Sequence, residues 1–378
     1  MKAPSATALK QAEKFIPWWE PSLGEEEQRR VAKVLESNYL NDGEVTAEFE
    51  RRLARFCGAA HAVGVTSGTA GIFLSLAACG VGPGDEVIIP DITFVATANA
   101  VKLAGAKPVL VDVCPENFSL EPERVAKAIT SRTKAIVPVH VNGRAADMET
   151  ILSLAKKKNL LVVEDAAETL GATWRGKSLG TIGHAGALSF ASSKLITTGQ
   201  GGAVLTNNEK TRNRVKELKD HGRLNTGTGG ADQHPVVGYN FKLTNLQSAV
   251  GLAQLDKLPD RLLHLKRIYQ WYQDELEGVK GVKPVPFDLK AGHQPQWIDC
   301  LCDKRDELAE ALLKKGIQTR KFWFPIHTLP PYRADAKQFP NAVRVSKRGL
   351  WLPSSISLTR EDLLRVTGVI KEFFRTKN

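Results

Sequence analysis

Short runs of valine, isoleucine and leucine alternate with helix-like segments between about residues 60 and 206. Seven of these apolar runs are predicted to be strands: residues 62–65, 86–89, 108–113, 135–141, 160–164, 186–190 and 202–206. Several are apolar almost throughout, which is typical of strands buried on both faces. Residues 121–129 and 147–158 lie between strands and carry apolar residues at helical spacing. The pattern predicts an α/β domain around a large, mostly parallel seven-stranded sheet.

Helical patterns dominate on both sides of this segment. Ser22 and Glu25 have the spacing of a capping box, so a helix is expected over residues 25–36, preceded by an arm that packs on the domain or on a partner chain. Later helices are predicted at residues 209–220, 244–257, 259–276, 303–315 and 360–374. We therefore expect two domains, a large one over residues 1–255 and a smaller α/β domain over residues 256–378.

Composition narrows the class of protein. The 378 residues are 42% hydrophobic and 25% charged, as in ordinary globular proteins. The formal net charge of +11 raises the possibility of a nucleic-acid partner, but the basic residues are scattered and form no arginine-rich arm, so none is expected. The charge is better suited to attracting a small anionic substrate. The sequence has no apolar run long enough to span a membrane and no N-terminal signal core, so a cytoplasmic protein is expected. The five cysteines lack the spacing of a zinc site, so no metal is expected.

A lysine and an aspartate carry the main chemical signal. Asp165 stands at the carboxyl end of one predicted strand, and Lys194 lies in a small polar loop after another. Open α/β sheets bind ligands outside these strand ends, so both side chains are expected to face one crevice. A lysine that forms a Schiff base and a carboxylate that keeps a pyridine nitrogen protonated are the groups that pyridoxal 5′-phosphate (PLP) needs. The chain is therefore predicted to use PLP. The alternative for Asp165 is that it only caps the helix that follows, and the alternative for Lys194 is that it is an ordinary surface lysine.

Four further residue patterns fit the same cofactor. Ser67-Gly68-Thr69-Ala70 forms a strand-to-helix turn whose backbone N–H groups suit a phosphate, and the hydroxyl of Ser189 stands at another strand end. Glu168 is close enough to Asp165 to reach the phenolic oxygen of PLP. Phe94 follows a predicted strand, where an aromatic ring either joins the core or stacks on a pyridine ring.

The motifs together resemble those of the DegT-type nucleotide-sugar aminotransferases of the PLP fold type I superfamily, over about residues 16–374. The matching motifs are Ser67-Gly-Thr-Ala70, Thr93-Phe-Val-Ala-Thr97, Glu164-Asp-Ala-Ala167, Ser189-Phe190 with Lys194, and Gly238-Tyr-Asn240. The resemblance implies that Lys194 holds the cofactor covalently and Asp165 pairs with its ring nitrogen. It further implies that Gly68, Thr69 and Ser189 bind the phosphate and that Phe94 stacks on the ring. Asn240 would reach the phosphate of the other subunit, which implies a homodimer with shared active sites.

The substrate follows from the same resemblance. The segments that begin at Lys194, Gly238 and Phe324 are most similar to the perosamine-synthase-like group, which aminates C4 of the sugar. This implies transfer of the amino group of L-glutamate to C4 of a nucleotide-linked 4-keto-6-deoxy sugar destined for polysaccharides such as O-antigen. The nucleotide (GDP, UDP or dTDP) stays open.

Substrate-contacting residues are expected at Asn41, Lys242 and His327. Gln200 and Lys242 stand where an acidic residue and an arginine are usual, and Ser192-Ser193 replace a bulkier pair, so the sugar itself is less determined than the reaction. The alternatives to a C4 aminotransferase are an aminotransferase that acts at C3 of the sugar and a regulator that binds PLP without catalysis. Lysine at position 194 argues against the relatives that dehydrate the sugar, which carry histidine there.

Overall fold

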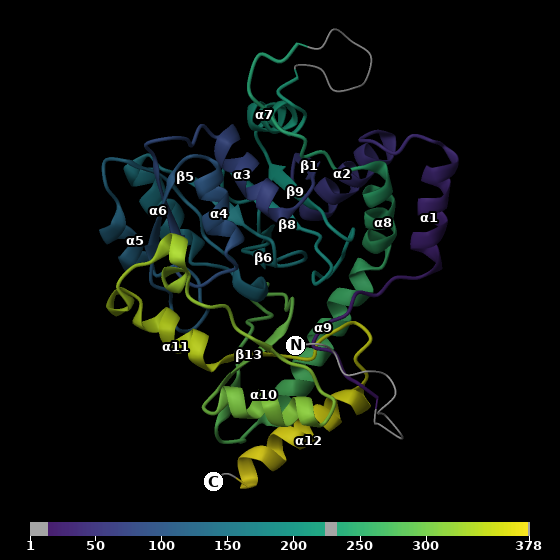
Figure 1. Cartoon of the computed structure of the whole chain (residues 1–378), viewed down its shortest axis with the longest axis vertical. Coiled ribbons are helices and arrows are strands. Elements are labelled where there is room, and N and C mark those ends of the chain that lie inside the picture. Colours follow the sequence, from purple (N-terminus) through teal and green to yellow (C-terminus); the bar gives the residue numbers. More distant parts are fainter. Residues whose placement is uncertain (1–13, 224–232, 377–378) are drawn as a thin grey trace.

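A central seven-stranded sheet organises the larger part of the computed structural model, which describes residues 14–223 and 233–376 (Figure 1). Its strands are β1 (His61–Val65), β2 (Glu86–Pro90), β3 (Lys107–Val111), β4 (Thr133–Ile136), β5 (Leu161–Asp165), β8 (Ala185–Ser189) and β9 (Gly202–Thr206). The strand order is β1-β9-β8-β5-β4-β2-β3, and only β9 runs antiparallel to its neighbours. The prediction of a large, mostly parallel sheet is confirmed.

Helices cover both faces of this sheet because alternate strand residues point to opposite sides. Val87 and Ile89 of β2 belong to one buried cluster, and Ile88 between them belongs to another. The helices are α1 (Glu25–Glu36), α2 (Glu44–Cys57), α3 (Gly68–Ala78), α4 (Ala96–Leu103), α5 (Pro122–Ala128), α6 (Met148–Lys158), α7 (Glu209–Lys219) and α8 (Asn245–Asp256). Helices α3, α4 and α7 contribute to the first cluster, and α5 and α6 to the second.

Helix α9 (Leu258–Leu276) leads from this part to a smaller one, in the lower half of Figure 1. There β10 (Val282–Pro284), β11 (Ile298–Cys302), β12 (Arg320–Lys321) and β13 (Gly349–Leu352) form an antiparallel sheet in the order β10-β11-β13-β12. Helices α10 (Arg305–Lys314), α11 (Pro340–Arg348) and α12 (Arg360–Thr376) accompany it, and a small hairpin pairs β6 (Thr173–Trp174) with β7 (Lys177–Ser178). The division at residue 255 stays a prediction, because one buried cluster continues from Phe49 to Trp351 across it.

The ends of several elements differ from expectation. Helix α1 begins at Glu25 as predicted, but Gly24 rather than Ser22 precedes it, and the backbone N–H of Gly24 donates to the Glu27 carboxylate (2.8 Å). Helices α2, α4 and α11 were not predicted. Each lacks a side-chain cap at its start, although Pro340 begins α11 and Gly58 caps the end of α2.

The N-terminal arm packs on the smaller part from residue 14 onward. Ile16 forms a β-bridge with Ile317, and its N–H donates to Gly316 (2.9 Å). The polar loop predicted at residues 225–234 lies mostly outside the described residues. Among the helices that the structure describes, none has the length and apolar character required to cross a bilayer.

Candidate active site

A cavity of about 270 Å³ lies where several strands of the large sheet end. Asp165 and Ser189 end β5 and β8, Ser67 follows β1, and Phe94 follows β2. The cavity is lined by Ser67, Gly68, Thr69, Ile72, Thr93, Phe94, Ala96, Val139, Asp165, Ala167, Glu168, Ser189, Ala191, Ser193, Lys194, Gln200, Trp297, Arg320, Trp323 and Trp351. The structure thus brings seven of the expected cofactor residues to one place, at the strand ends where open α/β sheets bind ligands.

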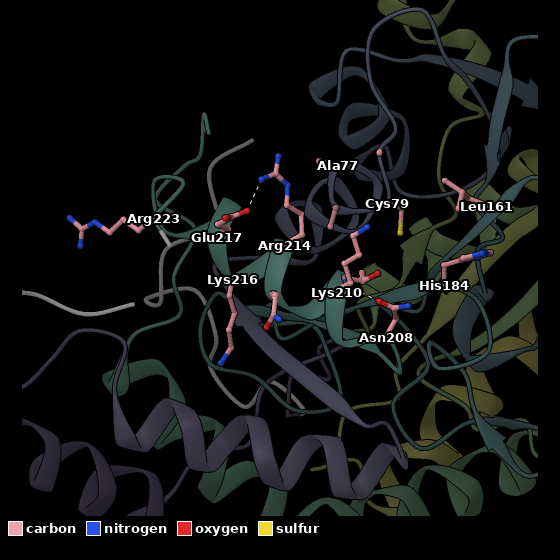
Figure 2. A pocket seen from close by; sticks show the side chains of 14 residues that line it. Ala77, Cys79, Leu161, His184, Asn208, Lys210, Arg214, Lys216, Glu217 and Arg223 are labelled. Atoms are coloured by element: carbon pink, nitrogen blue, oxygen red, sulfur yellow. Dashed lines mark hydrogen bonds and ion pairs between the residues drawn. The ribbon is translucent and has the colours of Figure 1, made fainter. Parts of the chain in front are cut away.

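A larger cavity, of about 1060 Å³, lies beside α7 and contains none of these residues (Figure 2). Its labelled side chains include Lys210, Lys216 and the ion pair of Arg214 with Glu217 (2.6 Å). Size alone therefore does not locate the chemistry. The smaller cavity is the candidate active site because an amine (Lys194), two carboxylates (Asp165 and Glu168) and the open backbone N–H groups at the start of α3 all line it.

Lys194 is held in a loop that two tryptophans fix from outside. The indole N–H of Trp297 donates to the carbonyl of Ser193 (3.0 Å), and that of Trp19 donates to the carbonyl of Ser192 (3.2 Å). The Nζ atom of Lys194 lies 3.2 Å from Oε1 of Glu168 and 4.6 Å from the centre of the Trp297 ring. The lysine side chain is only 12% exposed, so its amine is directed into the cavity and not into solvent.

Asp165 is a buried carboxylate with room for one more partner. Its Oδ2 accepts from the Thr97 hydroxyl (2.6 Å), and its Oδ1 accepts from the backbone N–H of Ala167 (3.2 Å). Burial raises the pKa of Asp165 above its ordinary value, and these hydrogen bonds offset only part of the effect. A cationic N–H group in the cavity would stabilise the ionised form, as a protonated pyridine nitrogen does.

The neighbouring Glu164 has a different role, although it belongs to the same sequence motif. It is fully buried, and its carboxylate accepts from Nε2 of His140 (3.0 Å). It also accepts from the backbone N–H groups of Gly180, Ile182 and Gly183. With all these bonds made inside the protein, Glu164 stabilises the loop after β7 while Asp165 faces the cavity.

The start of α3 forms a cradle for an anion. Within the turn, the backbone N–H of Ala70 donates to the Ser67 hydroxyl (3.1 Å), and that of Gly71 donates to the Ser67 carbonyl (3.0 Å). The N–H groups of Gly68 and Thr69 precede them and point out of the helix end. A Cβ atom on Gly68 would lie 2.9 Å from Cβ of Ser189, so glycine lets the turn and this serine meet. Such a helix start, next to a hydroxyl, matches the chemistry of a phosphate.

Phe94 and Glu168 complete the set around the cavity. The Phe94 side chain is 52% exposed although it lines the cavity, which leaves its ring free to contact a planar ligand. Glu168 accepts from the backbone N–H of Asn142 (3.0 Å) with one oxygen and contacts Lys194 with the other. The residues present therefore fit PLP in charge, hydrogen bonding and shape.

Three other expected residues lie in a third cavity, of about 570 Å³, which also contains Asp220. Asn41, Asn240 and Lys242 line it, and the Lys242 ammonium pairs with Asp220 (2.5 Å). Neither Lys194 nor Asp165 lines this cavity. Within one chain the structure therefore does not bring these three residues to the cofactor set.

His327 is buried and lines none of these three cavities. It is 2% exposed, its Nδ1 lies 2.6 Å from Oδ2 of Asp91, and its ring stacks on Phe339. Burial raises the pKa of Asp91 to about 6, although the bonds from His327 oppose this shift. The imidazole joins the segment after β2 to the segment after β12. The sugar contact expected of His327 stays a prediction.

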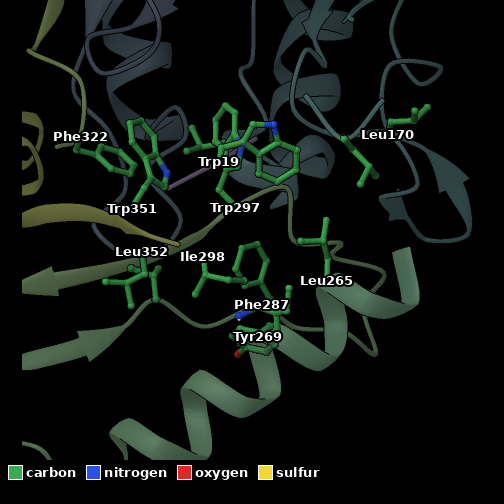
Figure 3. Close-up of a cluster of buried hydrophobic side chains, with 14 of the residues drawn as sticks. Trp19, Leu170, Leu265, Tyr269, Phe287, Trp297, Ile298, Phe322, Trp351 and Leu352 are labelled. Carbon is green, nitrogen blue, oxygen red and sulfur yellow. Dashed lines mark hydrogen bonds between the residues drawn. The ribbon is translucent and has the colours of Figure 1, made fainter. Parts of the chain in front are cut away.

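Residues of the smaller part were missed by the sequence analysis. Trp297, Arg320, Trp323 and Trp351 close the cavity opposite the large sheet. Figure 3 shows Trp297 and Trp351 within an aromatic cluster that also holds Trp19 and Phe322. Their positions in the sequence are far apart, so no local pattern signals a common site.

The chain belongs to the DegT/DnrJ/EryC1/StrS aminotransferase family, whose model matches residues 21–371. It is 37% identical to the GDP-perosamine synthase of Caulobacter vibrioides, over 93% of this chain and 96% of that protein. The solved structure of DesV from S. venezuelae is similar, with a TM-score of 0.87, 33% identity and coverage of 92% and 94% of the two chains. The solved structure of Spr1654 from Streptococcus pneumoniae in its PLP form has a TM-score of 0.91 at 26% identity, with coverage of 96% and 99%.

These findings confirm the predicted fold class and cofactor. The protein is a PLP-dependent sugar aminotransferase of fold type I.

Proposed function

We propose that the protein transfers the amino group of L-glutamate to C4 of a nucleotide-linked 4-keto-6-deoxy sugar, with transfer to C3 as the alternative. The observation that carries the proposal is the convergence of Lys194, Asp165 and the open N–H groups of α3 on one cavity. The similarity to a GDP-perosamine synthase over almost the whole chain supports the choice of sugar class.

Each residue has a proposed role toward the cofactor. Lys194 binds PLP covalently, Asp165 accepts a hydrogen bond from the ring nitrogen, and Phe94 stacks on the ring. Gly68, Thr69 and Ser189 bind the phosphate. When bound, PLP supplies an electron-withdrawing ring that stabilises negative charge on the substrate carbon next to nitrogen. Asp165 strengthens this effect because its negative charge in a buried setting keeps a proton on the ring.

Lys194 also moves the proton that amino transfer requires. Its Nζ lies 3.2 Å from Glu168, which is itself fixed by Asn142, so a released amine stays near the reacting carbon. A positioned amine of this kind acts as base toward one carbon and as acid toward another. Glu168 is proposed to reach the phenolic oxygen of the cofactor from the same position.

The active sites are proposed to be shared in a homodimer. Asn240 lines a cavity distinct from that of Lys194, which is expected if it reaches the phosphate of the other subunit. Large apolar residues adjacent in sequence to residues that line the two cavities are exposed in the single chain: Val237 (80%) stands three positions before Asn240, and Phe324 (75%) follows Trp323. A partner subunit would cover such side chains. Asn41 and Lys242 would then face the partner's substrate.

A product assay tests the proposed function. The purified protein is incubated with L-glutamate and each of several GDP-, UDP- and dTDP-linked keto-sugars, and the masses of the products are measured by mass spectrometry. We expect one nucleotide class to gain an amino group, and NMR of that product to place nitrogen on C4. Nitrogen on C3 would select the alternative, and no aminated sugar from any class would contradict the proposal.

A further inference from the structure

Arg320 is a cation in the active-site cavity that no carboxylate of the described chain neutralises directly. It belongs to β12 and lines the cavity together with Lys194. The carbon at the centre of its guanidinium lies 5.0 Å from the ring centre of Trp18 and 5.5 Å from that of Trp351. Over residues 14–223 and 233–376, its guanidinium has these ring contacts but neither an ion pair nor a hydrogen bond.

The environment of Arg320 favours an incoming anion. Arg320 is half-buried, so its charge has lost part of its hydration; this burial lowers the pKa of the guanidinium, while the charge of Glu168 acts in the opposite direction. Glu168 makes no ion pair with Arg320; its carboxylate oxygens contact the Lys194 ammonium and the backbone N–H of Asn142 instead. A partly desolvated cation without a committed partner is stabilised when a ligand supplies the negative charge.

Three anionic groups enter this site under the proposed function: the cofactor phosphate, the nucleotide diphosphate and the carboxylate of the amino donor. The phosphate has its own cradle at Gly68 and Ser189, and the contacts of Arg320 are instead with Trp18, Trp351 and the Glu168 charge. A nucleotide diphosphate is separated from C4 of its sugar by the width of the pyranose ring. In an α-amino acid, by contrast, the amine and the α-carboxylate are attached to one carbon, so the carboxylate stays close to the reacting nitrogen.

We propose that Arg320 binds the α-carboxylate of the amino donor and thereby selects α-amino acids as donors. The inference rests on the proposed function, because it assumes a donor amine that reacts at the position of Lys194. The contacts of the guanidinium with the Trp18 and Trp351 rings use none of its N–H groups in hydrogen bonds, so these groups are available for a bidentate bond to a carboxylate. Trp297, 5.5 Å from Trp351, connects the arginine side of the cavity to the loop that holds Lys194.

The donor half-reaction tests this role. The cofactor-loaded protein is mixed with L-glutamate without any sugar, and cofactor absorbance is followed by stopped flow. For Arg320→Gln we expect the half-saturating glutamate concentration to rise about 10- to 100-fold, the effect of losing one charge-assisted contact. The matched control is Arg344→Gln on α11, an exposed arginine of the smaller part outside the cavity, for which we expect a change within about twofold.

Two further measurements separate a carboxylate contact from a general structural role. 4-Aminobutyrate carries hydrogen in place of the α-carboxylate of glutamate, so the preference for glutamate over it should fall in Arg320→Gln by the same factor. Glutarate has no amine to react, and its binding is followed by the fluorescence of the tryptophans that flank Arg320. Its titration should shift to higher concentration in Arg320→Gln and stay unchanged in Arg344→Gln.

Defined outcomes would overturn the proposal. Equal losses for glutamate and 4-aminobutyrate would show that Arg320 only supports the fold. An unchanged glutamate reaction with an impaired reaction of the aminated sugar would assign Arg320 to the nucleotide diphosphate. If Arg320→Gln does not fold, Arg320→Lys keeps the charge but loses the planar fork, and it should show an intermediate shift. A parent protein that reacts with no amino acid would contradict the proposed function, while the glutarate titration would still test the carboxylate site.

Discussion

At the scale of single residues, the amine of Lys194 is the group whose loss is expected to cost most activity. Lys194→Ala removes both the proposed covalent link and the proton carrier, so turnover should be lost while the fold is kept. Turnover and thermal midpoint are measured together, and borohydride reduction of the parent protein followed by peptide mapping should place the pyridoxyl group on Lys194. A label on any other lysine would contradict the assignment.

Asp165→Asn tests the proposed pairing with the ring nitrogen. The amide keeps the shape of the side chain but loses its negative charge, so the ring nitrogen should lose its proton more readily. We expect PLP to stay bound and turnover to fall about 10²-fold or more, as when other key electrostatic partners are removed. Steady-state turnover within about threefold of the parent would show that Asp165 does not have this role.

Asp165 also gives a pH prediction for the cofactor-free protein. Burial raises its pKa in the folded state above that of the unfolded chain. The folded protein therefore holds this proton more tightly, and its stability should decrease as pH rises through the folded pKa. The Asp165→Asn variant has no carboxyl group to ionise at this position. As pH rises above the ordinary pKa of an aspartate, the thermal midpoint of the parent should therefore fall relative to that of the variant. Adding PLP supplies the cationic partner and should remove this difference.

At the scale of elements, the contact between β9 and the start of α3 sets the geometry of the phosphate cradle. A Cβ atom on Gly202 would lie 2.5 Å from the backbone carbon of Ser67, so Gly202→Ala must push the turn away from β9. We expect PLP affinity to fall at least about tenfold and the free energy of unfolding to fall by about 1–3 kcal/mol, as for other overpacked sites. PLP titration and denaturant unfolding measure the two effects.

Gly82→Ala is the matched control for this substitution. A Cβ atom there meets no neighbour within 4 Å, so both PLP affinity and stability should stay close to the parent values. Equal PLP affinity in Gly202→Ala and Gly82→Ala would show that the cradle does not depend on the close approach of β9.

At the scale of the whole molecule, the proposed shared site predicts recovery of activity between two inactive variants. Lys194→Ala lacks the amine, and Asn240→Asp places a negative charge where Asn240 is proposed to meet the partner's phosphate. After subunit exchange, half of the dimers are mixed, with both lesions in one site and none in the other. Activity should therefore rise toward about a quarter of the parent value, because repulsion of the phosphate is local to the site that receives the aspartate.

Verified exchange makes this experiment decisive. Mass spectrometry of intact dimers, or two affinity tags, confirms that mixed dimers have formed. The absence of any recovery in such a sample would mean that Asn240 acts in its own subunit's site or in none. Each variant mixed with itself provides the baseline.

The sequence by itself determined the features that depend on local patterns. The seven strands follow from short apolar runs, because a strand buried on both faces needs apolar side chains whatever lies beside it. Lys194, Asp165 and Gly68 were predicted to share a crevice because each follows a strand end, and the ends of the strands that bear them meet at one edge of the sheet. The structure brings these three residues together in one cavity.

Only the tertiary structure decided which distant segments meet there. Arg320, Trp297 and Trp351 close the cavity because the smaller sheet packs against the loop of Lys194, a contact that no local pattern encodes. Tertiary packing also buries His327 against Asp91 and places Asn240 in another cavity. The physical reason is that periodicity reports only whether a residue is buried, whereas its neighbour across the chain is set by how whole elements pack.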